Sequence, residues 1–158
     1  MGCIFSEDAK YKTAKPFSLI GKFRAYVLEC YDGDTLVCSV KYEGIFLRVR
    51  VRIKGCDAYE VKVPKMYKGR RILNREELAI KGKQARDFLA TMTEGKYVTL
   101  LCEGFEKFGR VLADAKVLHQ GVETSACALL IERRHAFPYS GKGEKAQVAE
   151  YILAGPES

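Results

Sequence analysis

The sequence predicts an α+β domain that is mainly β, in which five strands form a small barrel accompanied by about three helices. At 158 residues, the chain is long enough for one domain with its own hydrophobic core. Apolar residues alternate with a period of two in several runs, as in strands with one buried face. One longer run instead spaces its apolar residues as an amphipathic helix does. No linker rich in Pro, Ser or Gly divides the chain.

The N-terminal part of the chain predicts a leader followed by two strands. Residues 1–20 are basic, and we expect them to form a flexible leader ahead of a folded domain at residues 21–154. Phe23–Cys30 alternates as a strand, Asp32–Thr35 supplies a turn, and Leu36–Lys41 returns as the antiparallel partner.

A third strand is predicted by the most regular alternation in the chain, Ile45–Ile53, which follows a turn at Glu43 and Gly44. Successive side chains of a strand point to opposite sides. The apolar residues therefore share one face, namely Ile45, Leu47, Val49, Val51 and Ile53. Phe46 and three arginines fall on the other face, so we expect Arg48, Arg50 and Arg52 to point away from the core.

A helix is predicted after the polar, lysine-rich segment Val61–Arg75, which we expect to be a loop. Asn74 and Glu77 have the spacing of a capping box. The run that follows places apolar side chains at helical spacing, at Ala85, Phe88, Leu89 and Met92, and Gly95 and Lys96 end it.

The remaining elements complete the barrel. Tyr97–Cys102 and Val111–Leu118 are predicted strands on either side of a turn at Phe108 and Gly109. A second helix should start at Thr124 or Ser125 and run through Arg134, and a short third helix is expected within Glu144–Leu153. Five strands with a helix between the third and fourth is the element order of an OB-fold barrel.

Charge and cysteine usage limit the class of partner and the compartment. The formal net charge is +7, which favours a polyanionic partner, either nucleic acid or an acidic membrane surface; a domain with many solvated lysines is the alternative. The cysteines stand singly, without the spacing of a zinc site, at positions 3, 30, 38, 56, 102 and 127. No secretory signal or membrane-spanning run is present, so we expect free thiols in a cytoplasmic, non-secreted protein.

The first six residues fit an acylation signal. Gly2, with Ser6 four positions later, matches the pattern for N-myristoylation, and the adjacent Cys3 could carry a palmitoyl chain. Three lysines follow, at positions 10, 12 and 15, and could meet anionic headgroups. These features predict a lipoprotein on the cytoplasmic face of a membrane; a chance match to a short pattern is the alternative.

Two acidic clusters and two arginines carry the chemistry. Asp32 and Asp34 lie in the first turn, Asp57 and Glu60 follow the third strand, and Arg52 and Arg110 accompany them. Carboxylates beside guanidinium groups suit a metal-assisted attack on a phosphodiester, because carboxylate oxygens hold a hard cation and arginines neutralise charge on phosphorus. Taken singly, each aspartate also fits an ordinary turn or strand-end residue.

These motifs resemble the staphylococcal nuclease (thermonuclease-like) family in their order and spacing. The resemblance spans roughly residues 23–141 and rests on five segments: Asp32-Gly33-Asp34-Thr35, Arg52 through Asp57-Ala58-Tyr59-Glu60, Lys81-Gly82-Lys83-Gln84-Ala85-Arg86, Lys107-Phe108-Gly109-Arg110, and Ala136-Phe137-Pro138-Tyr139-Ser140-Gly141. It also implies an OB-fold barrel.

The resemblance implies a role for each site residue. Asp34 and Asp57 would be carboxylate ligands of a calcium ion, with the backbone carbonyl of Ala58 as a further ligand. Glu60 would orient or deprotonate the attacking water, and Arg52 and Arg110 would grip the scissile phosphate. Finally, Lys107 would contact a terminal phosphate and Tyr139 a base.

Together these features predict a monomeric, calcium-dependent nuclease. The expected substrates are single-stranded DNA and RNA with little sequence preference, and the resemblance implies a 3′-phosphate product. Two alternatives stay open: a non-catalytic nucleic-acid or protein-binding module, and a structural adaptor attached to a membrane. Departures from the family pattern are Tyr59 in place of proline, Phe108 in place of tyrosine, and Arg134 where glycine usually ends a helix. We expect Tyr59 to loosen the turn that bears Glu60.

Overall fold

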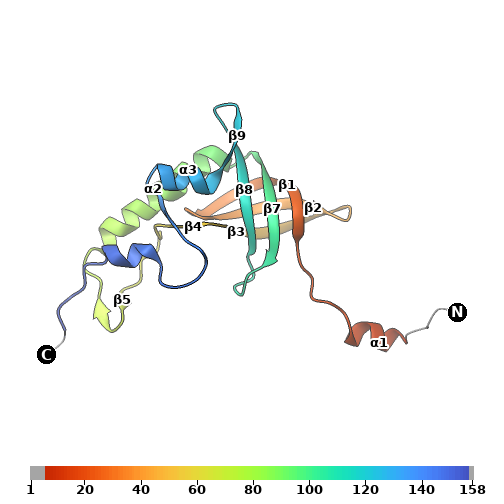
Figure 1. Ribbon diagram of the computed structural model, residues 1–158, viewed down its shortest axis with the longest axis horizontal. Coiled ribbons are helices and arrows are strands. Elements are labelled where there is room, and N and C mark those ends of the chain that lie inside the picture. The colour runs from red at the N-terminus through yellow and green to blue at the C-terminus, as the bar shows by residue number, and fades with distance from the viewer. Residues whose placement is uncertain (1–5, 157–158) are drawn as a thin grey trace.

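A closed five-stranded barrel forms the centre of the computed structural model, which describes residues 6–156 (Figure 1). The barrel strands are β1 (Ile20–Asp32), β2 (Thr35–Tyr42), β3 (Ile45–Ile53), β7 (Tyr97–Phe105) and β8 (Val111–His119). They lie in the order β3-β2-β1-β7-β8, and a parallel pairing of β3 with β8 closes the barrel. The predicted mainly β, OB-like barrel is confirmed.

The long first strand bends so that it pairs on both sides. Its first half is antiparallel to β7, with Tyr26 opposite Tyr97, and its second half is antiparallel to β2, with Ala25 opposite Val40 at the overlap. Register shifts between Val27 and Glu29 and beyond Cys30 bend the strand. Such bulges increase the local twist and allow a short sheet to close.

The core face of β3 is the predicted one except at Ile45, and one residue of the opposite face, Arg52, is buried rather than exposed. Leu47 is half-buried and Val49, Val51 and Ile53 are buried, whereas Ile45 is exposed at the turn. Arg48 and Arg50 face solvent as predicted. Arg52, on the same side of the strand, is instead buried, because neighbouring segments cover this end of the barrel.

Helix α2 (Arg75–Thr93) packs against the barrel and begins where the sequence predicts. The predicted cap is wrong in its detail, since Asn74 makes no side-chain cap. Its amide instead donates to the carbonyl of Glu150 and accepts from the amide of Ile152, both at 2.9 Å. Helix α3 (Ala126–Glu132) has the predicted cap, because the Ser125 hydroxyl accepts from the Ala128 amide.

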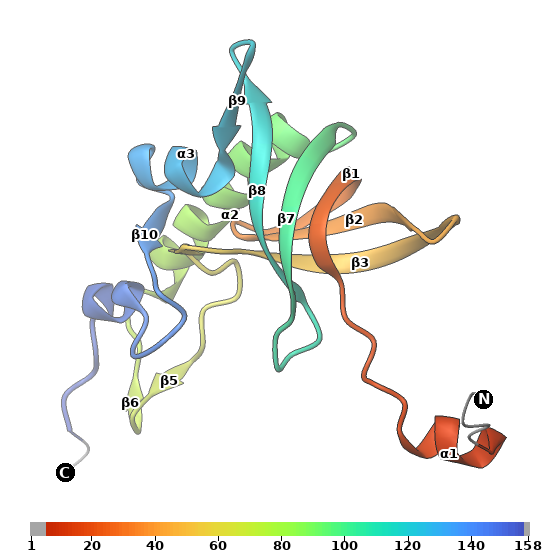
Figure 2. The same ribbon diagram turned by 45° about the vertical axis from the view of Figure 1, so that its right-hand side comes forward.

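Several short elements surround one end of the barrel (Figure 2). The segment expected to be a loop contains a small hairpin, and β4 pairs with β10 to hold the chain that follows β3. The last predicted helix is a 3-10 helix. The bounds of these elements are β4 (Cys56–Ala58), β5 (Met66–Tyr67), β6 (Arg70–Arg71), β9 (Val122–Ser125), β10 (Ala136–Pro138) and η1 (Ala146–Glu150).

The leader contains a short helix, α1 (Glu7–Lys12), that the sequence did not predict. The Ser6 hydroxyl caps it by accepting from the Ala9 amide at 3.3 Å, and the helix buries no residue. The proposed acylation residues Gly2 and Cys3 lie outside the described residues. Figures 1 and 2 show the leader extending away from the barrel.

The described cysteines are free thiols, as predicted. Four are buried and Cys127 is half-buried, and burial raises the pKa of the Cys30 thiol to about 11. Within the described part of the chain, no helix has the length and apolar composition needed to cross a bilayer.

Candidate active site

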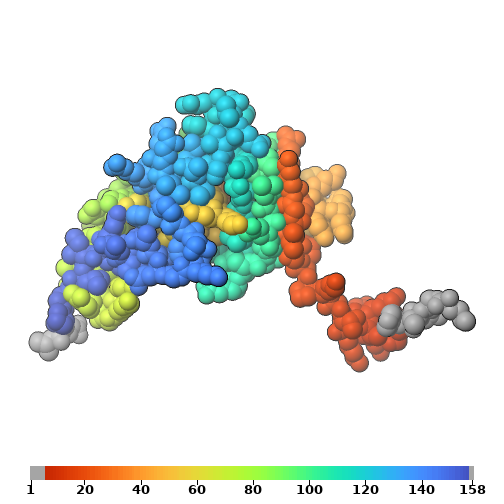
Figure 3. Space-filling model, in the orientation of Figure 1, coloured from red at the N-terminus to blue at the C-terminus, as the bar shows by residue number. Residues whose placement is uncertain are grey.

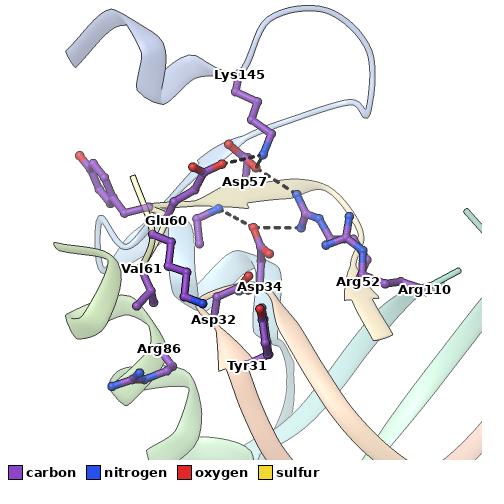
Figure 4. A pocket seen from close by; sticks show the side chains of 13 residues that line it. Tyr31, Asp32, Asp34, Arg52, Asp57, Glu60, Val61, Arg86, Arg110 and Lys145 are labelled. Atoms are coloured by element: carbon purple, nitrogen blue, oxygen red, sulfur yellow. Dashed lines mark hydrogen bonds and ion pairs between the residues drawn. The ribbon is translucent and has the colours of Figure 1, made fainter. Parts of the chain in front are cut away.

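The predicted catalytic and metal-binding residues line one cleft of about 420 Å³ at an end of the barrel (Figure 4). They come from separate segments: Asp34 from the β1–β2 turn, Arg52 from β3, Asp57 and Ala58 from β4, Glu60 just beyond β4, and Arg110 from the turn before β8. The barrel therefore brings together the residues that the sequence motifs single out.

Asp34 is held in a fixed orientation inside the cleft. Its Oδ2 accepts from the Ala58 amide at 2.7 Å and lies 3.1 Å from the Arg52 guanidinium, and its Oδ1 accepts from the Thr35 hydroxyl at 3.2 Å. Asp32 shapes the turn, because its Oδ1 accepts from the Asp34 amide. Burial raises the pKa of Asp34 to about 7 although Arg52 opposes this.

Asp57 is the most deeply buried acid of the cleft, with 1% of its side chain exposed. Its Oδ1 lies 3.1 Å from Arg52 and 3.3 Å from Lys145, and its Oδ2 accepts from the Gln147 amide at 3.3 Å. Arg52 therefore bridges Asp34 and Asp57. A buried guanidinium between two carboxylates offsets the cost of burying the charges.

Glu60 lies at the open side of the cleft and pairs with Lys145. The ammonium of Lys145 is 3.2 Å from Glu60 Oε1, and the Glu60 amide donates to the side-chain oxygen of Gln147 at 3.3 Å. Burial works against the charge of Lys145, yet Asp57 and Glu60 together raise its pKa above the usual value. The base predicted to activate water is thus oriented through both its side chain and its backbone.

Arg110 is oriented toward the cleft by an acid of its own turn. Glu106 contacts the Arg110 guanidinium at 3.3 and 3.2 Å, and a further guanidinium nitrogen donates to the Thr35 hydroxyl at 3.2 Å. Burial disfavours the charge of Glu106, but Arg110 holds its pKa below the usual value. Since Thr35 also contacts Asp34, Arg110 and the acidic cluster are linked by one hydroxyl.

Asp34 and Asp57 could hold a cation only if backbone carbonyl oxygens and water supplied the remaining ligands. Within residues 6–156, no three Asp, Glu, His or Cys side chains converge closely enough to hold a metal ion by themselves. Asp34 and Asp57 do share one buried wall of the cleft, where Arg52 contacts both carboxylates. Two carboxylates completed by a carbonyl and water suit calcium, which tolerates irregular oxygen coordination.

A second hollow of about 510 Å³ adjoins the cleft and contains both predicted substrate-binding residues. Lys107 and Tyr139 line it, and it shares Arg52, Arg110 and Lys145 with the cleft. The Tyr139 hydroxyl donates to the carbonyl of Gly143 at 3.2 Å. The two hollows thus meet at a basic junction formed by Arg52, Arg110 and Lys145.

Two of the three departures from the family pattern are accommodated by local contacts. Tyr59 does not loosen its turn: it is 8% exposed, donates to Glu150 at 2.7 Å and packs edge-on against Phe137. Phe108 is exposed beside the second hollow, with the Lys107 ammonium over its ring. Arg134 adopts the left-handed region at φ 59°, where glycine would be less strained.

Several residues in or beside the cleft were not predicted from the sequence, among them Lys145, Gln147 and Arg86. Lys145 and Gln147 reach it from the C-terminal segment, and no spacing rule connects them with acids more than 80 positions earlier. Arg86 lines the cleft from α2. It belongs to the segment of the family resemblance at residues 81–86, to which the resemblance assigns no role, and that segment is the one sequence feature that points to it.

The chain matches no protein-family model and no curated protein sequence.

Proposed function

We propose that this protein is a metal-dependent nuclease of the staphylococcal nuclease (thermonuclease-like) family. The supporting observation is that Asp34, Asp57, Glu60, Arg52 and Arg110 line one cleft although they come from separate segments. A barrel needs no ion pairs of this kind for its stability, because well-packed apolar residues of similar volume often serve as well; the acids and arginines at this end of the barrel therefore favour a functional role.

The side chains have distinct tasks in this proposal. Asp34, Asp57 and the Ala58 carbonyl would hold a calcium ion, which when bound supplies positive charge beside the phosphate and makes a neighbouring water more acidic. Glu60 takes the proton of the attacking water. Arg52 and Arg110 neutralise the charge that grows on the phosphate oxygens, so their contribution is larger in the transition state than in the bound substrate.

The second hollow would receive a nucleotide next to the scissile bond. Lys107 supplies positive charge for a phosphate, and Tyr139 offers a ring on which a base can stack. Stacking is available only to unpaired bases and differs little among them. We therefore propose single-stranded DNA and RNA as substrates, cleaved without strong sequence preference.

A hydrolysis assay tests this proposal directly. Purified protein is incubated with denatured DNA in calcium or in chelator, and we expect degradation only with calcium. Glu60→Gln should lower the rate by about 10²–10⁴-fold, the usual contribution of a general base. Glu123→Gln, an exposed glutamate of β9, is the matched control and should act like the wild type.

A second measurement does not depend on catalysis. Calcium at a hundredfold excess over its dissociation constant should stabilise the protein by about 2.7 kcal/mol. The thermal midpoint should therefore rise with calcium in the wild type and stay constant in Asp57→Asn. A wild-type midpoint that ignores calcium would refute the metal site.

A non-catalytic nucleic-acid-binding module is the second candidate, and one observation favours it. Arg52 and Lys145 already pair with Asp34, Asp57 and Glu60, so the acidic set is partly neutralised by the chain itself. A module of this kind would retard denatured DNA in a gel with or without calcium and would leave it intact. That result would replace the nuclease proposal.

A further inference from the structure

The outward face of the β2–β3 hairpin carries exposed aromatic and basic side chains that run from the turn toward the cleft. Phe46 is 74% exposed at the end of the hairpin and lies directly opposite Lys41, whose ammonium is 6.0 Å from its ring. Arg48 and Arg50 follow Phe46 on the same side of β3, and both are exposed. Ile45, beside Phe46 at the turn, belongs to the opposite side of the strand but is 59% exposed because the turn leaves it uncovered. We call Lys41, Phe46, Arg48 and Arg50 the hairpin face, and Ile45 adjoins it at the turn.

The basic residues of the hairpin face have no acidic partner in the protein. Among the described residues, none of Lys41, Arg48 and Arg50 forms an ion pair. The sole acid between residues 35 and 53 is Glu43, in the turn itself. Three cations against one acid therefore favour an anionic partner.

Apolar and basic side chains in this arrangement suit a lipid surface better than a nucleic acid. Aromatic rings settle at the boundary between headgroups and acyl chains, and nearby Lys and Arg contact anionic headgroups. An isoleucine beside the phenylalanine adds apolar area that a bilayer can bury. A nucleic acid would use the cations but would gain little from Ile45.

The leader leaves the barrel beside the same end of the hairpin. The ring of Phe17 packs edge-on against Tyr42 of β2, with centroids 5.4 Å apart, and lies tilted against Phe105, with centroids 5.8 Å apart. Leu19 is fully buried and fastens the chain just before β1. Figures 1 and 2 show the leader and the β2–β3 turn on one side of the barrel, away from β4 and α2. The basic leader and the hairpin face can therefore meet one surface together.

We infer that the hairpin face binds the surface of an anionic phospholipid bilayer. Phe46 and Ile45 enter the boundary below the headgroups, and Lys41, Arg48 and Arg50 contact the headgroup phosphates and carboxylates. A single acyl chain anchors a protein only marginally, so this face supplies the second attachment that an acylated leader would need. The inference requires neither acylation nor nuclease activity.

Membrane binding in this orientation leaves the cleft open. The cleft lies at the Thr35 end of β2 and the hairpin turn at the Tyr42 end. With a rise of about 3.3 Å per residue, the eight residues of β2 separate them by about 25 Å. With the turn inserted first, a nucleic acid in solution can reach the cleft, although Arg50 of the hairpin face lies only two residues from Arg52.

A single-tryptophan reporter tests where the bilayer touches. The chain contains no tryptophan, so Phe46→Trp introduces the only indole. The unacylated protein, made in bacteria, is mixed with vesicles of phosphatidylcholine with or without phosphatidylserine. We expect a blue shift of the emission with the phosphatidylserine vesicles and a much smaller one without. Met66→Trp, on the exposed β5–β6 hairpin, is the matched control and should not shift.

Vesicle sedimentation measures the contribution of each part. Phe46→Ser should weaken binding of the unacylated protein by about tenfold, and Arg48→Gln with Arg50→Gln by more, since each basic residue near an anionic leaflet contributes about fivefold. Calcium-dependent hydrolysis of DNA and the thermal midpoint should not change. Absence of DNA hydrolysis would therefore not affect the inference of membrane binding, and absence of vesicle binding would not affect the proposed nuclease activity.

Three results would overturn the inference. The first is wild-type protein that stays in the supernatant with phosphatidylserine vesicles at low salt. The second is a Phe46→Ser variant that binds as the wild type does. The third is retardation of denatured DNA that depends on Arg48 and Arg50 while vesicle binding does not, which would assign the face to nucleic acid.

Discussion

In the proposed metal site, Lys145 would compete with calcium for the carboxylates of the cleft. Its ammonium lies 3.3 Å from Asp57 and 3.2 Å from Glu60, and its side chain is 44% exposed. A partly exposed ion pair contributes up to about 1 kcal/mol, which corresponds to about fivefold in affinity. We therefore expect Lys145→Met to lower the calcium concentration for half-maximal thermal stabilisation by about fivefold. A calcium titration of the thermal midpoint measures this, with Lys142→Met from the same loop as control. A higher calcium requirement in Lys145→Met would instead mean that the lysine organises the site.

The sequence motifs predicted the acids of the cleft but not how they are paired. Asp34, Asp57 and Glu60 lie in short motifs whose spacing is visible in the chain, whereas Lys145 comes from a segment 85 positions beyond Glu60. The alternation of β3 predicts that Arg52 points away from the core, and the structure agrees about the side of the strand on which it lies. It is nevertheless buried, because β4 and the C-terminal segment close over the end of the barrel, which no periodicity reports.

Helix α2 sets the position of the Glu60 backbone through one glycine. A Cβ at Gly82 would lie 2.2 Å from the carbonyl oxygen of Glu60 and 2.6 Å from the amide nitrogen of Val61, so a side chain would push this backbone away. In an ordinary helix interior, Gly→Ala stabilises by about 0.5–1 kcal/mol. We expect Gly82→Ala to destabilise the protein instead, and to lower hydrolysis by about 10²-fold, as a displacement of about 1 Å does.

Urea unfolding and the DNA assay measure both effects of Gly82→Ala. Lys83→Ala, the next and exposed position of α2, should leave stability and rate nearly unchanged. If Gly82→Ala proved more stable and fully active, α2 would not position Glu60.

The contact between α2 and the end of α3 makes stability depend on pH. The ring of His135 lies against Phe88 of α2, with centroids 4.8 Å apart. Burial, together with Arg133, lowers the pKa of His135 below its ordinary 6.5. The unfolded chain therefore binds this proton more strongly. The contribution of His135 to stability is complete above pH 6.5 and is lost as the pH falls through the lower folded pKa.

A substitution isolates this contribution. The stability difference between wild type and His135→Gln should change between pH 7.5 and pH 5.5, with the wild type losing more on acidification. Denaturation midpoints at the two pH values measure it, and His119→Gln is the control. Equal losses in the wild type and His135→Gln would exclude His135 as the titrating group.

The elements that the sequence predicted are those with strong periodicity. The alternation at Ile45–Ile53 gave β3 with its bounds, and the apolar spacing after Asn74 gave α2. The β5–β6 hairpin was missed because each of its strands has two residues, too few for a pattern. Asn74 has the sequence of a cap but binds Glu150 and Ile152 instead, since a distant segment offers its backbone groups. Rules for helix caps consider only residues near in sequence, so they do not foresee partners more than 70 positions away.

The C-terminal segment ties the barrel and the cleft into one unit. Figure 3 shows it in blue, spread over the face beside the yellow-green residues. The Leu73 amide donates to Ile152 at 2.7 Å and the Ala154 amide to Arg71 at 2.8 Å, so the segment fastens the chain that precedes α2. Tyr151 and Leu153 pack on a second hydrophobic cluster of Tyr59, Val63, Ile72 and Leu78. A residue on this segment, Gln147, supports both Asp57 and Glu60.

A chain that ends at Gly143 should therefore keep its barrel but lose its site. The lost apolar contacts and hydrogen bonds correspond to at least about 3 kcal/mol of the free energy of unfolding. Calcium-dependent hydrolysis should disappear, since Glu60 loses the Gln147 contact that holds its backbone. Urea unfolding and the DNA assay measure the two losses. Removal of residues 1–14 is the control and should change neither, because α1 buries no residue. If the shortened chain were as stable and as active as the full one, the barrel alone would have to orient Asp57 and Glu60.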